Sequence, residues 1–67
     1  MCRIEFKVGN AAFRLNTETD ENGNAPLDTW AVADAIRHIA FEIENGETSG
    51  MIMDANGNTV GKFVVED

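Results

Sequence analysis

Residues 26–45 read PLDTWAVADAIRHIAFEIEN, and this stretch decides the fold because its apolar residues recur at the spacing of an α-helix. With a rotation of about 100° per residue, the branched apolar side chains fall on one narrow stripe of the helix. We call this stripe the seam and expect it to face the core. The seam consists of Val32, Ile36, Ile39 and Ile43. Pro26 and Asp28 suit the first turn, and Gly46 suits a left-handed C-terminal cap. The sequence therefore predicts a helix over residues 26–45.

The same helix carries a second group of large side chains on nearly the opposite side. This outer stripe consists of Trp30, Asp34, Arg37 and Phe41, with His38 beside it. A helix that packs on one sheet needs only one apolar side, and Trp and Arg dominate binding hot spots. We therefore expect the outer stripe to be a protein interface. Alternatively, Trp30 packs over the loop of residues 18–24.

A first hairpin is predicted upstream of the helix. Residues 2–8 alternate between apolar and charged side chains, which is typical of a half-buried strand. Gly9-Asn10 has the composition of a type II′ turn, and residues 11–17 return as a second strand with Phe13 and Leu15 facing inward. By this alternation, Cys2 also points inward.

A second hairpin is predicted downstream of the helix, with strands over residues 48–54 and 59–66. Asn56-Gly57 is the preferred pair for a type I′ turn between them. Counting outward from this turn places Met53 opposite Val60. The strand over residues 59–66 is apolar on both faces apart from one lysine, as expected of a central strand.

Lys62 decides which face of the sheet lies under the helix, because burying an unpaired lysine is strongly unfavourable. The helix is therefore expected to cover the opposite face, and the predicted core consists of Ile4, Phe6, Val8, Phe13, Leu15, Val32, Ile36, Ile39, Ile43, Ile52, Phe63 and Val65. The open face then combines basic and apolar side chains: Arg3, Lys7, Arg14, Lys62, Met51, Met53, Val60 and Val64. Met51, Met53 and Val64 form a second candidate interface, unless long neighbouring side chains cover them.

The predicted fold class is α+β: a ββαββ single domain over residues 1–67, in which two hairpins form a four-stranded sheet and one helix packs across one face. A chain of this size buries roughly 60% of its unfolded surface, so its core is thin. A lone cysteine excludes an internal disulfide, which leaves association with a second copy or a larger partner as the route to added stability.

Composition limits the partners. Twelve acidic residues against five basic ones give a net charge of −7 and an isoelectric point near 4.4, which argues against nucleic acid as a partner. The sequence shows neither a signal peptide nor an apolar run of about 18 residues, so we expect no membrane partner. With its lone free cysteine, the chain fits the reducing cytoplasm.

No pattern in the sequence indicates catalysis, and we expect no catalytic residue, cofactor or metal. His38 lies four residues from Asp34, where a modest ion pair can form, but no nucleophile is placed to work with it. Residues 20–24 and 54–58 both begin like a calcium loop, D-x-N-x-N. Both lack the glycine at the sixth position and the bidentate glutamate at the twelfth.

The stretch 44–50, followed by residues 54–61, resembles the C-terminal half of small uncharacterised proteins of phages and prophages. Those proteins carry the pattern I-x-x-G-x-x-S-G-x-x-x-D-x-N-G-N-x-V-G after an amphipathic helix. The resemblance covers about half of the chain and consists mostly of turn and cap residues. It implies a fold and a mobile-element origin, and it carries over no catalytic residue.

These observations favour a small acidic, non-enzymatic protein-binding module that forms a homodimer and acts on a host protein. The first alternative is an acidic mimic of nucleic acid that occupies a basic groove on a host defence or transcription complex. A more remote alternative is a nucleic-acid binder that uses the basic open face of the sheet.

Overall fold

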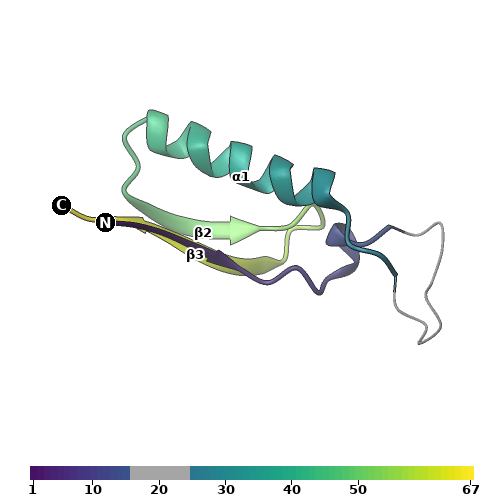
Figure 1. Cartoon of the computed structure of the whole chain (residues 1–67). Helices are drawn as coiled ribbons and strands as arrows, with labels where there is room; N and C mark the ends of the chain where they lie inside the picture. The colour runs from purple at the N-terminus through teal and green to yellow at the C-terminus, as the bar shows by residue number, and fades with distance from the viewer. Residues whose placement is uncertain (16–24) are drawn as a thin grey trace.

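The computed structural model describes residues 1–15 and 25–67 and has one helix on one antiparallel sheet. Its elements are β1 (Cys2–Phe6), the short 3₁₀ helix η1 (Ala11–Phe13), α1 (Thr29–Glu44), β2 (Ser49–Met53) and β3 (Thr59–Val65). The strand order is β1-β3-β2, so β3 is central. Figure 1 shows α1 along one face of the sheet, with both chain ends at one end of the molecule and η1 towards the other.

The predicted four-stranded ββαββ sheet is wrong, although the α+β class holds. Residues 11–13 form η1 instead of a strand, and Arg14 forms only an isolated bridge with Leu27. The backbone N–H of Leu15 donates to the carbonyl oxygen of Pro26 at 2.8 Å. The chain after η1 therefore pairs with the segment that precedes the helix, not with β1. Gly9 lacks the positive φ that a type II′ turn requires.

The helix begins three residues later than predicted because Asp28 is its N-cap. The Asp28 Oδ1 atom accepts from the backbone N–H of Trp30 at 3.0 Å and of Ala31 at 3.3 Å. These two bonds satisfy donors that the first turn leaves free. Gly46 follows the helix with φ +94°, so the predicted left-handed cap is confirmed.

The second hairpin forms with most of the predicted register. Ile52 pairs with Gly61 and Gly50 with Phe63, but Met53 pairs with Thr59 because of an irregularity after Ile52. The turn is not type I′, because among the described residues around it only Gly57 has a positive φ, at +85°. The Gly57 N–H donates to the Asp54 carbonyl at 3.0 Å, as in a type I turn followed by a left-handed glycine.

A buried carboxylate connects this turn to η1. The Asp54 side chain, only 7% exposed, accepts from the backbone N–H groups of Asn56 and Asn58 at 2.9 Å each. Its Oδ2 atom also accepts from the side-chain amide of Asn10 at 2.8 Å. Because Asn10 is the residue that precedes η1, this bond fixes the chain after β1 beside the turn between β2 and β3.

The core is smaller than predicted and is centred on β2, β3 and η1. Its buried apolar residues are Phe13, Ala35, Ile39, Ile52, Val60 and Phe63. Ile4, Leu15 and Ile36 were expected in it but are 41%, 40% and 45% exposed. Ile4 lies on the edge strand β1, whereas the closest backbone approaches of α1 are to η1 and β2. Val60, expected on the open face, lies beside the irregularity at the start of β3, where strand twist increases, and joins the core.

Two glycines allow the sheet to pack this closely. A Cβ on Gly50 would lie 2.7 Å from the ring of Phe63, so the ring occupies space that any other residue would fill. A Cβ on Gly61 would overlap the carbonyl oxygen of Glu5 and lie 2.6 Å from the Cβ of Phe6. Gly61 therefore allows β1 to lie close against β3.

We expect Ile39→Ala to lower the free energy of unfolding by about 2–5 kcal/mol, because Ile39 is 2% exposed and its truncation leaves a cavity. Ile36→Ala on the same helix should cost about 1 kcal/mol or less, since this side chain is already partly in water. Urea unfolding of both variants measures the difference. Equal losses would contradict the observed orientation of the helix.

Candidate protein-interaction surface

The outer stripe of α1 points away from the sheet, because Ala35 and Ile39 on the opposite side are buried. Trp30 is 80% exposed and Phe41 is 64% exposed, while Asp34 and Arg37 between them are also exposed. A contact of Trp30 with the loop of residues 18–24 lies outside the described residues. The stripe therefore presents two aromatic side chains and a guanidinium group on the helix surface.

The methionines of β2 lie on the edge strand that is next to the helix. Met51 is 64% exposed and Met53 is 58% exposed, so neighbouring side chains leave most of their surface uncovered. Val64, on the central strand, is half-buried and lines a shallow hollow on the open face together with Met51 and Lys62.

Two shallow grooves connect the helix to this edge. One, of about 370 Å³, is lined by Ala35, His38 and Glu42 of α1 and by both methionines of β2. The other, of about 160 Å³, places Asp34 and His38 beside Met53. Two candidate surfaces that the sequence treated as separate are therefore continuous at Met53. We call this combined region the α1/β2 surface; it consists of Trp30, Asp34, Arg37, His38, Phe41, Glu42, Met51 and Met53.

Glu42 was not among the candidate residues drawn from the sequence. Glu42 follows His38 by four residues, so helical spacing alone places it on the same flank. What the sequence did not reveal is that this flank adjoins β2. That follows from the position of the helix over the sheet, which depends on long-range packing.

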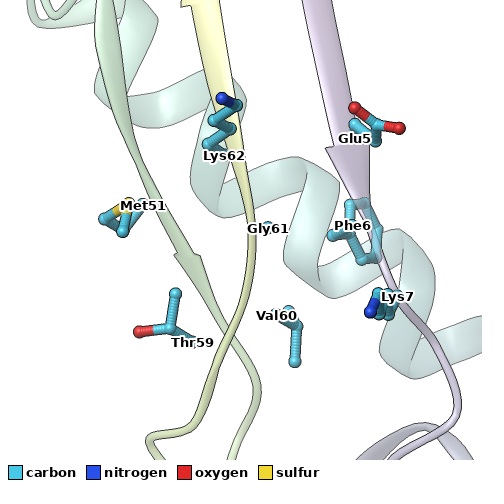
Figure 2. Close-up of a pocket in the computed structure, with 8 residues that line it drawn as sticks. All are labelled: Glu5, Phe6, Lys7, Met51, Thr59, Val60, Gly61 and Lys62. Carbon is cyan, nitrogen blue, oxygen red and sulfur yellow. The ribbon is translucent and has the colours of Figure 1, made fainter.

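Another hollow, of about 450 Å³, lies on the sheet near the ends of β1 and β2 and is shown in Figure 2. Gly61 contributes no side chain to it, and Met51, Lys62 and Lys7 stand around this position. The open face is less basic than expected because Arg14 lies outside the sheet, where its Nη1 atom donates to the carbonyl oxygen of Ala25 at 3.3 Å.

The titratable groups of the α1/β2 surface form one weak pair. The Nδ1 atom of His38 lies 4.0 Å from the Oδ2 atom of Asp34, and both side chains are well exposed. Cys2 lies on the predicted side of the sheet, paired with Val65 on the same face as Ile4, but it is exposed and not buried. Within the described residues no three His, Cys, Asp or Glu side chains gather as metal ligands. In the same part of the chain, no helix has the length and apolar character needed to cross a membrane.

Comparison with family models, curated proteins and solved structures finds no match to this chain. The resemblance to phage and prophage proteins therefore stays a prediction from the turn and cap residues.

Asp54 borders both grooves, and its ionisation is coupled to folding. The hydrogen bond from the Asn10 side chain and the one from the Asn58 backbone lower the pKa of Asp54, because they favour the charged carboxylate. These bonds are absent from the unfolded chain. Their stabilisation is therefore fully present above the unfolded pKa, near about 4, and is lost as the pH falls through the lower folded value.

We expect Asp54→Asn to lower the melting temperature at neutral pH and to weaken the dependence of the melting temperature on pH below about 4. Asp34→Asn is the matched control, because this exposed carboxylate lies outside the network and should keep the acid dependence of the parent. Thermal melts across a pH series measure both. An unchanged acid dependence in Asp54→Asn would contradict the coupling.

Proposed function

We propose that this chain is a non-enzymatic protein-binding module that forms a homodimer and binds a host protein through the α1/β2 surface. One observation carries the proposal. Trp30, Phe41, Met51 and Met53 are each more than half exposed, and the grooves beside Asp34 and His38 connect the flank of α1 to the methionines at the β2 edge. Exposed apolar side chains gathered on one region are typical of interaction sites.

The chemistry of this region suits protein recognition. Tryptophan combines a large apolar area with an N–H donor, and arginine is enriched at binding hot spots. Methionine side chains are flexible and polarisable, so they adapt to different partner shapes. Asp34, Arg37 and Glu42 supply charges around the apolar groups, as the rim of an interface does.

The net negative charge of the chain favours a partner with a basic surface. The chain carries a net charge of −7, and Glu42, Glu44 and Glu47 follow one another at the end of α1 and just beyond it. A partner with an apolar patch bordered by lysine and arginine would complement this arrangement and would associate faster at low ionic strength. The resemblance to phage and prophage proteins supports a host protein as that partner.

The small core supports the homodimer. Ile4 and Ile36 stay partly in water, so folding alone leaves apolar surface that association can cover.

We expect Trp30→Ala and Phe41→Ser to fold as the parent does and to lose at least about tenfold in affinity for the host partner, since truncation at an interface centre commonly costs about 2 kcal/mol or more. The partner is first captured with the immobilised parent chain from a lysate of the host and identified by mass spectrometry. Its affinity for each purified variant is then measured by calorimetry.

Leu27→Ser is the matched control, because Leu27 is 41% exposed but lies outside the α1/β2 surface. It should retain the affinity of the parent. If Trp30→Ala and Phe41→Ser bind as tightly as Leu27→Ser, the α1/β2 surface is not the binding site. Lower melting temperatures with unchanged affinity would show instead that the aromatic side chains stabilise their own chain.

A further inference from the structure

We infer that β1 is the dimer interface: two copies pair their β1 strands antiparallel, centred on Ile4, and form one continuous six-stranded sheet. This inference rests on the homodimer in the proposed function and adds the interface and its register. Within the described residues, β1 pairs only with β3, so its second edge is open.

Hydrogen bonds at the two ends of β1 show which of its backbone groups point towards β3 and which point towards the open edge. The Lys7 N–H donates to the Val60 carbonyl at 2.9 Å, and the Met1 carbonyl accepts from the Glu66 N–H at 2.7 Å. In an antiparallel pair such bonds recur at every second residue. Arg3 and Glu5 therefore also bond to β3, and the N–H and C=O groups of the three remaining residues point to the open edge. These residues are Cys2, Ile4 and Phe6.

If the two-fold axis of the dimer passes through Ile4, every residue of β1 lies opposite a residue of the second copy with which it can pair. Ile4 lies opposite Ile4 of the second copy, and Cys2 lies opposite Phe6, so each outward-pointing N–H meets an outward-pointing C=O. Arg3 lies opposite Glu5 in pairs that share no backbone bond, where the Cα atoms are about 4.5 Å apart and side chains approach most closely. Because of the two-fold symmetry, the dimer contains two of these ion pairs.

The same charges exclude the neighbouring registers. Centring the pair on Glu5 would place Glu5 opposite Glu5 and Arg3 opposite Lys7. Centring it on Arg3 would place Arg3 opposite Arg3. Like charges directly opposite one another are destabilising. Centring it on either end of β1 would leave much of the strand unpaired. The alternation of Arg3, Glu5 and Lys7 therefore specifies the register centred on Ile4.

Partly exposed apolar side chains on the helix side of the sheet support the same interface. Ile4 pairs with the buried Phe63 and so lies on the helix side of the sheet, but on the edge strand it is still 41% exposed. His38 and Glu42 occupy the β2 flank of α1, so Ile36, 45% exposed, lies on the flank turned towards β1. The two-fold axis is perpendicular to the sheet and keeps both helices on one face. It places the Ile4 side chains of both copies together in the strip between those helices.

The other edge of the sheet does not offer an equivalent site. The ladder between β2 and β3 shifts register between Ile52 and Met53, and such a bulge bends and twists the strand pair. Residues 49–53 also carry no charge that would select a register. Because β1 and β2 are at opposite edges, a dimer through β1 leaves the α1/β2 surface free for a partner.

Charge reversal of the full chain tests the register. Arg3→Glu and Glu5→Arg should each weaken dimerisation by at least about tenfold, since each creates two like-charge pairs per dimer. The combined variant restores both pairs and should return the dissociation constant to within about threefold of the parent. Sedimentation equilibrium measures the dissociation constants. Melts at low concentration control for the Arg3–Glu5 contact within one chain, where Nη2 and Oε2 are 3.7 Å apart.

Cross-linking tests the axis independently of charge. In a Cys2→Ser background, Ile4→Cys should form a disulfide-linked dimer on mild oxidation, because Cα atoms about 5.5 Å apart are within disulfide range. Lys62→Cys in the same background is the control. Its position on β3 is about 14 Å from its symmetry mate, counted as three strand spacings, so it should stay monomeric on non-reducing gels.

The outcomes of these experiments distinguish the proposed β1 register from the proposed homodimer. A dimer that neither single reversal weakens, or that the combined variant fails to restore, would overturn the β1 register and leave the homodimer standing. A parent chain that stays monomeric into the high micromolar range would overturn both the register and the homodimer. Binding of a host protein through Trp30 and Phe41 would still stand in that case, because its test does not depend on dimerisation.

Discussion

The hydrogen bond between the Asn10 side chain and the Asp54 carboxylate determines the arrangement of the rest of the molecule. It joins residues 44 positions apart and fixes the segment after β1 against the turn of the β2–β3 hairpin. From there η1 places Phe13 in the core, 5.8 Å from the ring of Phe6 between centroids, and α1 packs on η1 and β2. The helix therefore lies across one face of the sheet.

This position explains why the two edges of the sheet differ. At β2 the helix flank and the methionines form grooves, so the edge becomes part of a broad side-chain surface. At β1 the strand presents open backbone groups, with alternating charges on one face and the partly exposed Ile4 on the other. The proposed binding therefore uses side chains at the first edge and backbone hydrogen bonds at the second.

Local patterns in the sequence predicted the elements that depend on local interactions. The periodicity of residues 26–45 predicted the helix, and Gly46 predicted its end. Asn56-Gly57 located the second hairpin, and the apolar character of β3 predicted a central strand. The predicted strand over residues 11–17 was wrong over its described part, residues 11–15: their alternation resembles a strand, but their conformation depends on Asn10 and on pairing with Pro26. Both of those contacts join residues that are distant in sequence, and periodicity does not report them.

For the candidate surface, too, the sequence predicted the parts that depend on local structure and missed those that depend on long-range packing. Helical phase alone placed Trp30 and Phe41 in solvent, whereas the junction of Asp34 with Met53 required the position of the helix over β2. The aspartate at position 54 shows the limit most clearly. Its D-x-N-G-N context predicted only a hairpin turn, whereas Asn10, Asn56 and Asn58 donate hydrogen bonds to its oxygens. The carboxylate therefore satisfies donors of its own chain, and the apolar groups proposed for binding are the ones that the small core leaves uncovered.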